Sequence, residues 1–409
     1  MEIKGIDLKP KNMKKIISIF LLIIITFFLF NEFDKVKESS LRVIHKYSLR
    51  LSKNTAPKVY SFVANDFILR LEKITNHAIT TKTAGIWQDS IGNFQIYEQQ
   101  FDILKILTEH KINLDGRNVI KTIDKAGGMK RIFRFKNNLI GLFTFVSDDS
   151  SCYYASLINL TKSIEFMRGA CLPEIKQIDF NGMGGGHTEF NDKLLVAIGT
   201  PTGDSDEISN LAQDLNSYYG KILQFSLKDL STPFGKFNKS HIFSIGHRNP
   251  QGLINLDDDI YSVEHGPKGG DEINLVKSGQ NYGWPLYSFG SKYADGSAYP
   301  ANVGIKGFTA PIYTFIPSIG ISNVVKCPYV LTNRYAPAKC LLIGSLRANS
   351  VYVVLLNSSN RTVLSVEQIN VGMRVREFYE GELNNDLFIT TDGHGLHKIH
   401  FENVSAFFK

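Results

Sequence analysis

The sequence predicts an all-β fold, a six-bladed β-propeller preceded by an N-terminal membrane-anchor helix and a short helical stalk. The chain has 409 residues, and its 33 Gly and 28 Phe occur with short β-branched runs, which favours strands and turns over helix bundles. A loose repeat of turn residues and alternating strands extends from about residue 137 to the end. One long apolar stretch lies near the N-terminus.

The apolar stretch, residues 16–30, follows Lys14 and Lys15 and contains no charged residue. Such a segment is typical of a signal peptide or of an uncleaved signal anchor. The residues around its end, FNEFDK, lack the small side chains of a cleavage site, which favours the anchor and leaves secretion after cleavage as the alternative. The basic tail, residues 1–15, would then be cytoplasmic, and the bulk of the chain would lie outside.

The next segment, residues 31–80, has apolar residues at helical spacing. They include Leu41, Ile44, Leu49, Val59, Phe62, Phe67 and Leu71. We therefore expect a helical stalk or linker between the membrane and a propeller that spans residues 81–409.

The charge distribution excludes a nucleic-acid-binding surface on the main domain. Residues 1–60 hold twelve basic and five acidic side chains, a net of +7, which equals the net charge of the whole chain. Of the 46 basic and 39 acidic residues in the chain, 34 of each sign therefore remain beyond residue 60. The positive charge belongs to the tail and the stalk, and no nucleic-acid partner is expected.

The four cysteines, Cys152, Cys171, Cys327 and Cys340, match no zinc-binding spacing. In an oxidising compartment two local pairs, 152–171 and 327–340, would each close a hairpin-sized loop. Four cysteines allow three pairings, and four free thiols are the remaining alternative.

The repeat consists of an Asn/Asp pair, an alternating apolar strand and then a second strand. The copies are NNLIGLFTF (137–145), NDKLLVAIG (191–199), DDDIYSVEHG (257–266), NNDLFITTDG (384–393) and the weaker AKCLLIGSL (338–346). Polar turn residues before period-2 strands are what a stack of antiparallel sheets requires. At roughly 40–60 residues per blade the repeats predict about six blades, with tandem β-sandwiches as the alternative.

Polar residues are densest in GHRNPQG (246–252), EHGPKGGDE (264–272) and NYGWP (281–285). In a propeller such clusters fall in loops at strand ends, where ligands bind. Arg248 offers a planar fork suited to carboxylates, and the acidic pair after the Gly-Pro sequence supplies the hard oxygen ligands that Ca²⁺ prefers. The same residue types also build and cap turns, so chemistry alone leaves both interpretations open.

Taken together, GHRNPQGL, EHGPKGGDEINLV and KSGQNYGWPLYSFG resemble the signature of the pyrroloquinoline quinone-dependent aldose sugar dehydrogenases, the glucose/sorbosone dehydrogenase family. The segments AQDLNSYYGKIL (212–223), PSIGIS (317–322) and MRVREF (373–378) resemble those that flank the signature, in the same order. This resemblance covers residues 180–400. It implies a six-bladed β-propeller that uses pyrroloquinoline quinone and Ca²⁺ to oxidise the anomeric carbon of an aldose sugar to a lactone.

The resemblance also implies a role for individual residues. His187, in GGGHTEF, matches the base that takes the proton from the anomeric hydroxyl while hydride passes to the quinone. Arg248 and Asn249 match residues beside the quinone, and Arg374 and Arg376 match a pair that faces its carboxylates, since alternate residues of a strand share a face. We therefore expect these five side chains to converge on one cavity.

Two calcium sites follow from the same resemblance. The backbone carbonyls of Gly266 and Pro267 match ligands of a Ca²⁺ that polarises the quinone. The side chains of Asp271, Glu272 and Tyr282 match a second, structural Ca²⁺ site.

Several positions depart from the family pattern. Thr188 and Glu189 follow His187 where the family usually has Phe-Gly, and an added carboxylate there would raise the pKa of the base or hinder the substrate. Arg347 stands in place of a lysine that faces the cofactor. Residues 80–175 lack the motifs of the first two blades, so one wall of the cofactor pocket has no support from the sequence.

The resemblance implies an enzyme at the periplasmic face of the bacterial inner membrane, with a sugar as substrate, an electron acceptor that the sequence does not identify and a homodimer as one assembly. The alternative is a propeller of the same ancestry that binds a sugar or an envelope protein without turnover. A lactonase-like hydrolase would need a channel cluster of metal-binding carboxylates, which the sequence does not supply.

Overall fold

The computed structural model describes residues 59–403 except 75–78, 80, 90, 100–101, 114–116, 120–126, 173–179, 202–205, 301–306, 360 and 382–383. The predicted tail, the predicted anchor and the stalk up to residue 58 lie outside this range. None of the helices within it is long and apolar enough to cross a membrane. The described residues form six antiparallel sheets with few and short helices.

The first three sheets follow one another along the chain. The first comprises β3 (Thr83–Gln88) and β4 (Phe94–Glu98), followed by α2 (Ile103–Glu109). The second comprises β5 (Arg117–Val119), β6 (Met129–Phe135), β7 (Asn138–Ser147), β8 (Tyr153–Asn159) and β9 (Ile164–Arg168). The third comprises β10 (Gly184–Phe190), β11 (Lys193–Ile198), β12 (Lys221–Phe225) and β13 (Ile242–Ile245), with α3 (Asp206–Asn210) after β11.

The last three sheets continue this order, and the sixth also takes in the start of the described chain. The fourth comprises β14 (Pro250–Leu256), β15 (Asp259–Glu264), β16 (Asp271–Val276) and β17 (Tyr313–Phe315). The fifth comprises β18 (Ile321–Lys326), β19 (Lys339–Ser345), β20 (Ser350–Leu356) and β21 (Val363–Asn370), with α4 (Tyr329–Tyr335) after β18. The sixth comprises β22 (Val375–Glu380), β23 (Leu387–Thr391), β24 (Gly395–Asn403), β2 (Phe67–Lys73) and β1 (Val59–Val63).

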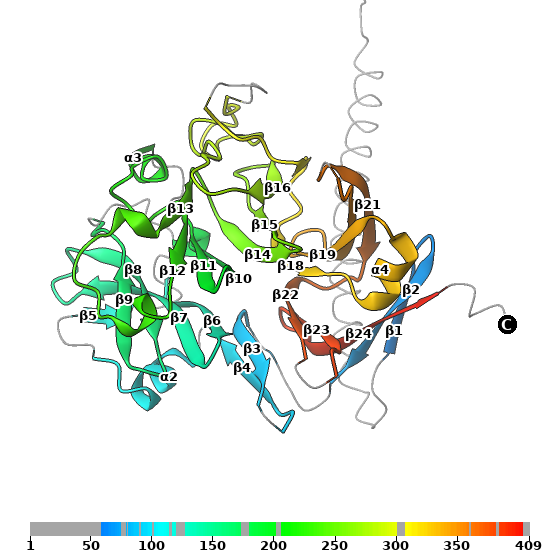
Figure 1. Ribbon diagram of the computed structural model, residues 1–409, viewed down its shortest axis with the longest axis horizontal. Helices are drawn as coiled ribbons and strands as arrows, with labels where there is room; N and C mark the ends of the chain where they lie inside the picture. Colours follow the sequence, from blue (N-terminus) through cyan, green and yellow to red (C-terminus); the bar gives the residue numbers. More distant parts are fainter. Residues whose placement is uncertain are drawn as a thin grey trace, which may run out of the picture. The chain divides into compact units, whose positions relative to one another are not determined.

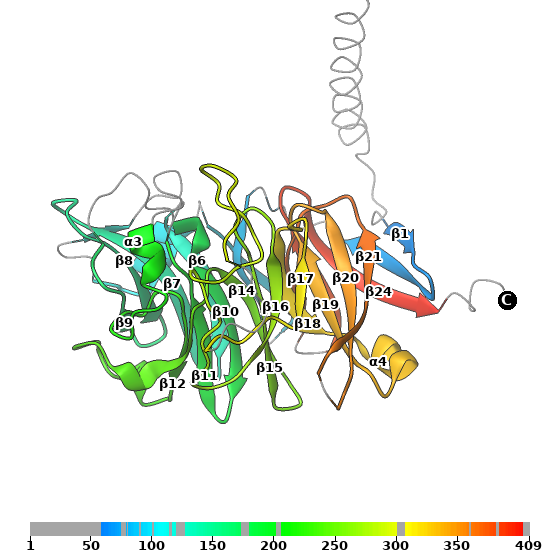
Figure 2. The ribbon, with the colours of Figure 1, turned by 90° about the horizontal axis from the view of Figure 1, so that it is seen from above.

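One strand from each of the six sheets lies at the centre of their arrangement. The strands β3, β6, β10, β14, β18 and β22 are neighbours in that order, and β22 is next to β3 again (Figure 1). These six inner strands therefore close a ring, and the other strands of each sheet lie outside it. Figure 2 shows α4 on the outside, where it contacts β19 and β24.

The predicted repeats coincide with the strand that follows the inner strand in five of the six sheets, all but the first. The copies form β7, β11, β15, β19 and β23, each followed by its partner strand. The Asn/Asp pair has a physical reason: Asn191 and Asp192, like Asp257 and Asp258, connect two strands directly, and all four have φ between 50° and 66°. Two-residue hairpin turns with positive φ at both positions favour Asn and Asp, so the repeated Asn/Asp pair reflects the residue preference of these turns.

The prediction of a helical stalk over residues 31–80 is wrong for its described part, because residues 59–73 form the hairpin β1–β2. The buried residues Phe67, Leu69 and Leu71 alternate along β2, which is strand periodicity. This strand pairs with β24 from Phe67↔Asn403 to Lys73↔His397. The apparent helical spacing came from combining residues of two strands, and the domain begins before residue 81.

Both predicted disulfides are confirmed. Cys152 pairs with Cys171 and Cys327 pairs with Cys340, with Cα–Cα distances of 5.2 and 5.3 Å. No free cysteine remains in the described residues. Each bond joins positions in neighbouring strands or turns, as the short sequence separations predict.

Candidate functional site

A cavity of about 470 Å³ opens where the inner strands begin. Its wall includes one residue within three positions before five of these six strands: Lys82, Gly182, Asn249, Ser318 and Arg374. Six predicted site residues line it, namely Arg248, Asn249, Gly266, Pro267, Arg374 and Arg376. The motifs that lie far apart in the sequence are therefore brought together because their strands start at the same end of the ring.

Arg248 is held against the wall by its guanidinium group. Its Nη1 donates to the carbonyl oxygens of Gly266 at 2.8 Å and His265 at 3.3 Å, and the guanidinium lies 5.3 Å from the ring centroid of Trp284. The Nε atom is buried and has no hydrogen-bond partner in the described part of the chain. A buried donor without a partner is costly, so this atom is suited to a ligand acceptor.

Arg374 and Arg376 share one carboxylate. Asp392 accepts from Arg376 at both oxygens, at 2.9 and 2.6 Å, and from Arg374 Nε at 3.1 Å. Arg374 Nη1 also donates to the carbonyl of Leu346 at 3.1 Å. Both arginines line the cavity, so Asp392 fixes two guanidinium groups in its wall.

Asn249 is the amide predicted beside the ligand, and it lies in the cavity wall. Its Oδ1 accepts from the Gly184 backbone at 3.0 Å and from Gln251 Nε2 at 2.6 Å. Because Oδ1 is occupied by these donors, the NH₂ group of the amide is the part that can donate to a ligand.

The sequence did not reveal Lys82, which lines the cavity from the turn before β3. It belongs to the region without recognisable motifs, and nothing local to Lys82 distinguishes it from a surface lysine. With Arg248, Arg374 and Arg376 it gives the described cavity wall four permanent positive charges and no acidic side chain. Such a wall favours a ligand with several carboxylates.

The expectation that His187 converges with the arginines is wrong. His187 lines a different cavity of about 280 Å³, together with Arg131, Asn323 and Glu377. Its ring stacks on Phe133 at a centroid distance of 3.7 Å, and its Nδ1 lies 3.1 Å from the carbonyl oxygen of Gly185.

The position of His187 follows from strand geometry. A strand advances ~3.3 Å per residue, so His187 lies several residues deeper in the ring than Gly182, which borders the arginine-lined cavity. Burial, with a smaller contribution from Arg131, lowers the pKa of His187 to about 3. The ring is therefore neutral near pH 7. Glu189 fills neither cavity, since its side chain is exposed and pairs with Lys136.

Arg347 also lies outside the arginine-lined cavity, contrary to the prediction. Its side chain is exposed and borders an outer pocket with Tyr313 and Tyr352. The neighbouring Leu346, in the bend that follows β19, lines the cavity instead. Lys82 supplies a cation that the sequence assigned to Arg347.

The structure does not assemble the predicted second calcium site from Asp271, Glu272 and Tyr282. Asp271 accepts from Ser318 Oγ and from the backbone of Gly266 and Ile321, whereas Tyr282 Oη donates to the Leu275 carbonyl. Asp271 and Glu272 are adjacent in β16 and so point to opposite faces. No cluster of three or more His, Cys, Asp or Glu side chains that could hold a metal occurs in the residues that the structure describes.

The carbonyls predicted for the first calcium site are both on the cavity wall. Gly266 O accepts from Arg248, and Pro267 O accepts from Tyr293 Oη at 3.3 Å. A carbonyl oxygen has two lone pairs, so Gly266 O can accept from Arg248 and still coordinate a cation together with Pro267 O.

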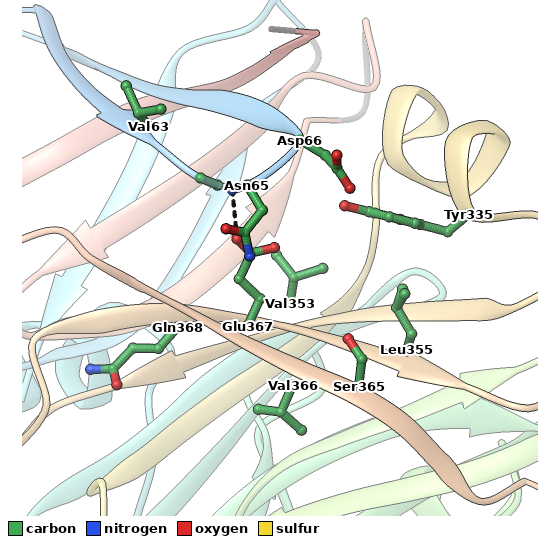
Figure 3. Close-up of a pocket in the computed structure, with 11 residues that line it drawn as sticks. Val63, Asn65, Asp66, Tyr335, Val353, Leu355, Ser365, Val366, Glu367 and Gln368 are labelled. Carbon is green, nitrogen blue, oxygen red and sulfur yellow. Dashed lines mark hydrogen bonds between the residues drawn. The ribbon is translucent and has the colours of Figure 1, made fainter.

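Another cavity, of about 810 Å³, lies elsewhere and is lined by no predicted site residue. Figure 3 shows it between the turn that joins β1 to β2, the end of α4 and the strands β20 and β21. Asp66 and Glu367 contribute negative charge to it. It does not share the cationic character of the cavity at the strand ends.

Comparisons with known proteins agree with the location of the cavity motifs. The profile of the family described as Glucose / Sorbosone dehydrogenase matches residues 176–398, more than half of the chain. The aldose sugar dehydrogenase YliI of Escherichia coli is 30% identical over 221 residues, which are 51% of this chain and 57% of the relative. Quinoprotein glucose dehydrogenase B of Acinetobacter calcoaceticus is 45% identical over 92 residues, 21% of this chain and 18% of the relative.

Among solved structures, the PQQ-bound form of the aldose sugar dehydrogenase from Streptomyces coelicolor has a TM-score of 0.52 at 19% identity, covering 85% of this chain and all of the other. This likeness shows a shared fold, that of the propeller-type sugar dehydrogenases. In sequence, the match spans about half the length of the curated aldose sugar dehydrogenase, and the four-cation cavity lies mainly in the matched part.

Proposed function

Because this chain belongs to the glucose/sorbosone dehydrogenase family, we propose that it oxidises an aldose sugar to a lactone with pyrroloquinoline quinone bound in the arginine-lined cavity. The observation that carries the proposal is the convergence of four cationic side chains and Asn249 on one cavity of about 470 Å³. A flat quinone with three carboxylates matches that charge and would fit a cavity of this size. The quinoprotein relative and the PQQ-bound neighbour support the choice of cofactor.

Different cavity residues would bind different groups of this cofactor. Arg374 and Arg376 would bind its carboxylates, because Asp392 fixes their guanidinium groups in the cavity wall. Arg248 and Asn249 would donate to the quinone oxygens and stabilise negative charge that develops there. The bound quinone supplies the two-electron acceptor for the sugar's anomeric carbon.

A calcium ion is part of the proposal only at the Gly266 and Pro267 carbonyls. Gly266 O has a second lone pair beside the hydrogen bond from Arg248, so the ion would bind without displacing the guanidinium and would add positive charge beside a carboxylated ligand. Calcium should therefore increase quinone affinity, and removal of calcium by a chelator should reverse the increase.

A second candidate function is cofactor or sugar binding without turnover. The observation that favours it is the position of His187 outside the cavity, since this removes the base that the sequence predicted. This function differs from the dehydrogenase function in its expected result, which is tight quinone binding with no reduction of an electron-accepting dye by any aldose.

The direct test adds pyrroloquinoline quinone and Ca²⁺ to the purified apoprotein, measures binding by calorimetry and follows dye reduction with a panel of aldoses. We expect micromolar or tighter binding and dye reduction with at least one sugar. The double variant Arg374→Ala/Arg376→Ala should weaken binding at least 100-fold, because two charge-assisted contacts are lost. Arg361→Ala removes an arginine that pairs with Asp259 far from the cavity lining and should leave affinity unchanged. Absence of both binding and dye reduction in the wild type refutes the proposal.

We further propose that each sheet is one blade of a six-bladed propeller, which the ring of six inner strands supports. Attachment to the bacterial inner membrane through residues 16–30, with the propeller in the periplasm, stays a prediction, as do the homodimer and the external electron acceptor. Fractionation of cells and a topology reporter fused after residue 58 would test the membrane prediction.

A further inference from the structure

Behind Arg248 lies a buried carboxylate that is not part of the arginine-lined cavity wall. Glu264, the last residue of β15, is 3% exposed and is not part of the cavity wall. Its Oε1 accepts from Asn274 Nδ2 at 2.7 Å and lies 3.1 Å from His247 Nδ1. Its Oε2 accepts from the backbone N–H of Arg248 at 3.0 Å.

The imidazole of His247 is oriented by its two neighbours. Its Nε2 lies 2.9 Å from Ser244 Oγ, and its ring stacks on Tyr282 at 4.7 Å. With Nδ1–H directed at Glu264, Nε2 accepts from the serine hydroxyl, so His247, Asn274 and the Arg248 backbone all donate to the carboxylate, which has the Glu272 carboxylate as its cross-strand neighbour. Glu264 is thereby fixed in one orientation, with Oε2 free for the Arg248 backbone.

The main chain of Arg248 is held on both sides. Glu264 accepts from its N–H, and its carbonyl accepts from the Thr200 backbone at 2.9 Å. The guanidinium donates to His265 and Gly266, the two residues that follow Glu264. Residues 264–266 therefore hold both the backbone and the guanidinium group of Arg248.

We propose that Glu264 is a positioning residue that acts through Arg248, holding the guanidinium where a quinone oxygen meets it. This inference rests on the proposed function. An arginine that is already oriented loses less conformational freedom when the ligand binds, so the carboxylate should raise ligand affinity without touching the ligand. A purely structural carboxylate would stabilise the fold and affect affinity independently of Arg248.

A double-mutant cycle separates these two roles. The affinity for pyrroloquinoline quinone is measured by absorbance titration for the full chain, Glu264→Gln, Arg248→Ala and the double variant. Glu264→Gln should weaken binding about tenfold in the wild type and less than twofold in the Arg248→Ala background. An equal loss in both backgrounds, or no loss in the wild type, overturns the proposal.

The control is Asp259→Asn. Asp259 stands at the opposite end of β15 and pairs with Lys339 and Arg361, so its loss removes ion pairs from the same strand but leaves the cavity wall intact. Its quinone affinity should match that of the wild type, even if its stability falls.

A second measurement keeps the inference testable if the quinone does not bind. Hydrogen exchange of the Arg248 Nε–H, followed by NMR with ¹⁵N-arginine labelling, should be slow in the wild type and in Asp259→Asn and at least tenfold faster in Glu264→Gln. No quinone binding together with this acceleration refutes the proposed function and supports the positioning role. Equal exchange rates in wild type and Glu264→Gln overturn the positioning role whether or not the quinone binds.

Discussion

At the scale of single residues, the position of each residue along its strand determines whether its predicted place in the cavity is correct. Spacing predicts that Arg374 and Arg376 share one strand face, and the family resemblance predicts that they meet Arg248 and Asn249, which the structure places on the same cavity wall. His187 could not be placed in the same way, because its depth in the ring depends on where β10 begins, which no local motif reports.

The burial of His187 leads to a prediction about pH. Its pKa of about 3 in the folded chain lies below the ordinary value of 6.5, so the unfolded chain binds this proton first as the pH falls. The contribution of His187 to stability is complete above pH 6.5 and is lost progressively toward pH 3. The free energy of unfolding of His187→Gln, measured with urea, should therefore decrease less between pH 7 and pH 4 than that of the wild type.

The same variant should bind pyrroloquinoline quinone with wild-type affinity, since residue 187 lies outside the arginine-lined cavity. His400→Gln, which changes a histidine whose side chain is 39% exposed, serves as the control for the pH dependence. A steep loss of quinone affinity in His187→Gln would contradict the placement of the side chain.

At the scale of elements, the residue types at turns made the adjacent strands predictable. The pairing of strands far apart in the sequence could not be predicted. The Asn/Asp pairs located the hairpins before β11 and β15, because positive φ at two successive positions restricts the residue type. The hairpin β1–β2 was missed, since its partner β24 is more than 300 residues away in the sequence and no local pattern reports that pairing. For the same reason Lys82 could not be recognised as part of the cavity.

Within the third sheet, the buried side chain of Lys221 holds the start of β12 against the preceding loop. This fully buried side chain starts β12 and donates to the carbonyls of Leu211, Ala212 and Tyr219 at 2.7–2.9 Å. Lys221→Met would remove three charge-assisted hydrogen bonds, although Leu211 O and Ala212 O keep backbone donors from Asp214 and Gly246, and should lower the free energy of unfolding by about 2 kcal/mol. Chemical denaturation measures this loss, and a change within about 0.5 kcal/mol, as expected for the exposed control Lys228→Met, would contradict it.

At the scale of the whole molecule, the two ends of the described chain share one sheet. Removing residues 1–73 would take β1 and β2 away, expose the apolar residues against which Phe67, Leu69 and Leu71 pack, and leave β24 as an open edge. We expect that truncation to aggregate or to melt at least 10 °C below a chain that lacks only residues 1–58, which keeps every residue that the structure describes. Equal melting temperatures in calorimetry would show that the hairpin does not contribute to the ring.

The composition of the cavity wall has a consequence for when the site exists during synthesis. Lys82 emerges from the ribosome among the first described residues and Arg376 among the last, yet both border the same space. The inner strands that carry them become neighbours only when the ring closes, and closure needs β2 to find β24 at the far end of the chain. A nascent or unclosed chain therefore has no complete pocket, so a bound cofactor would report that translation and folding are finished.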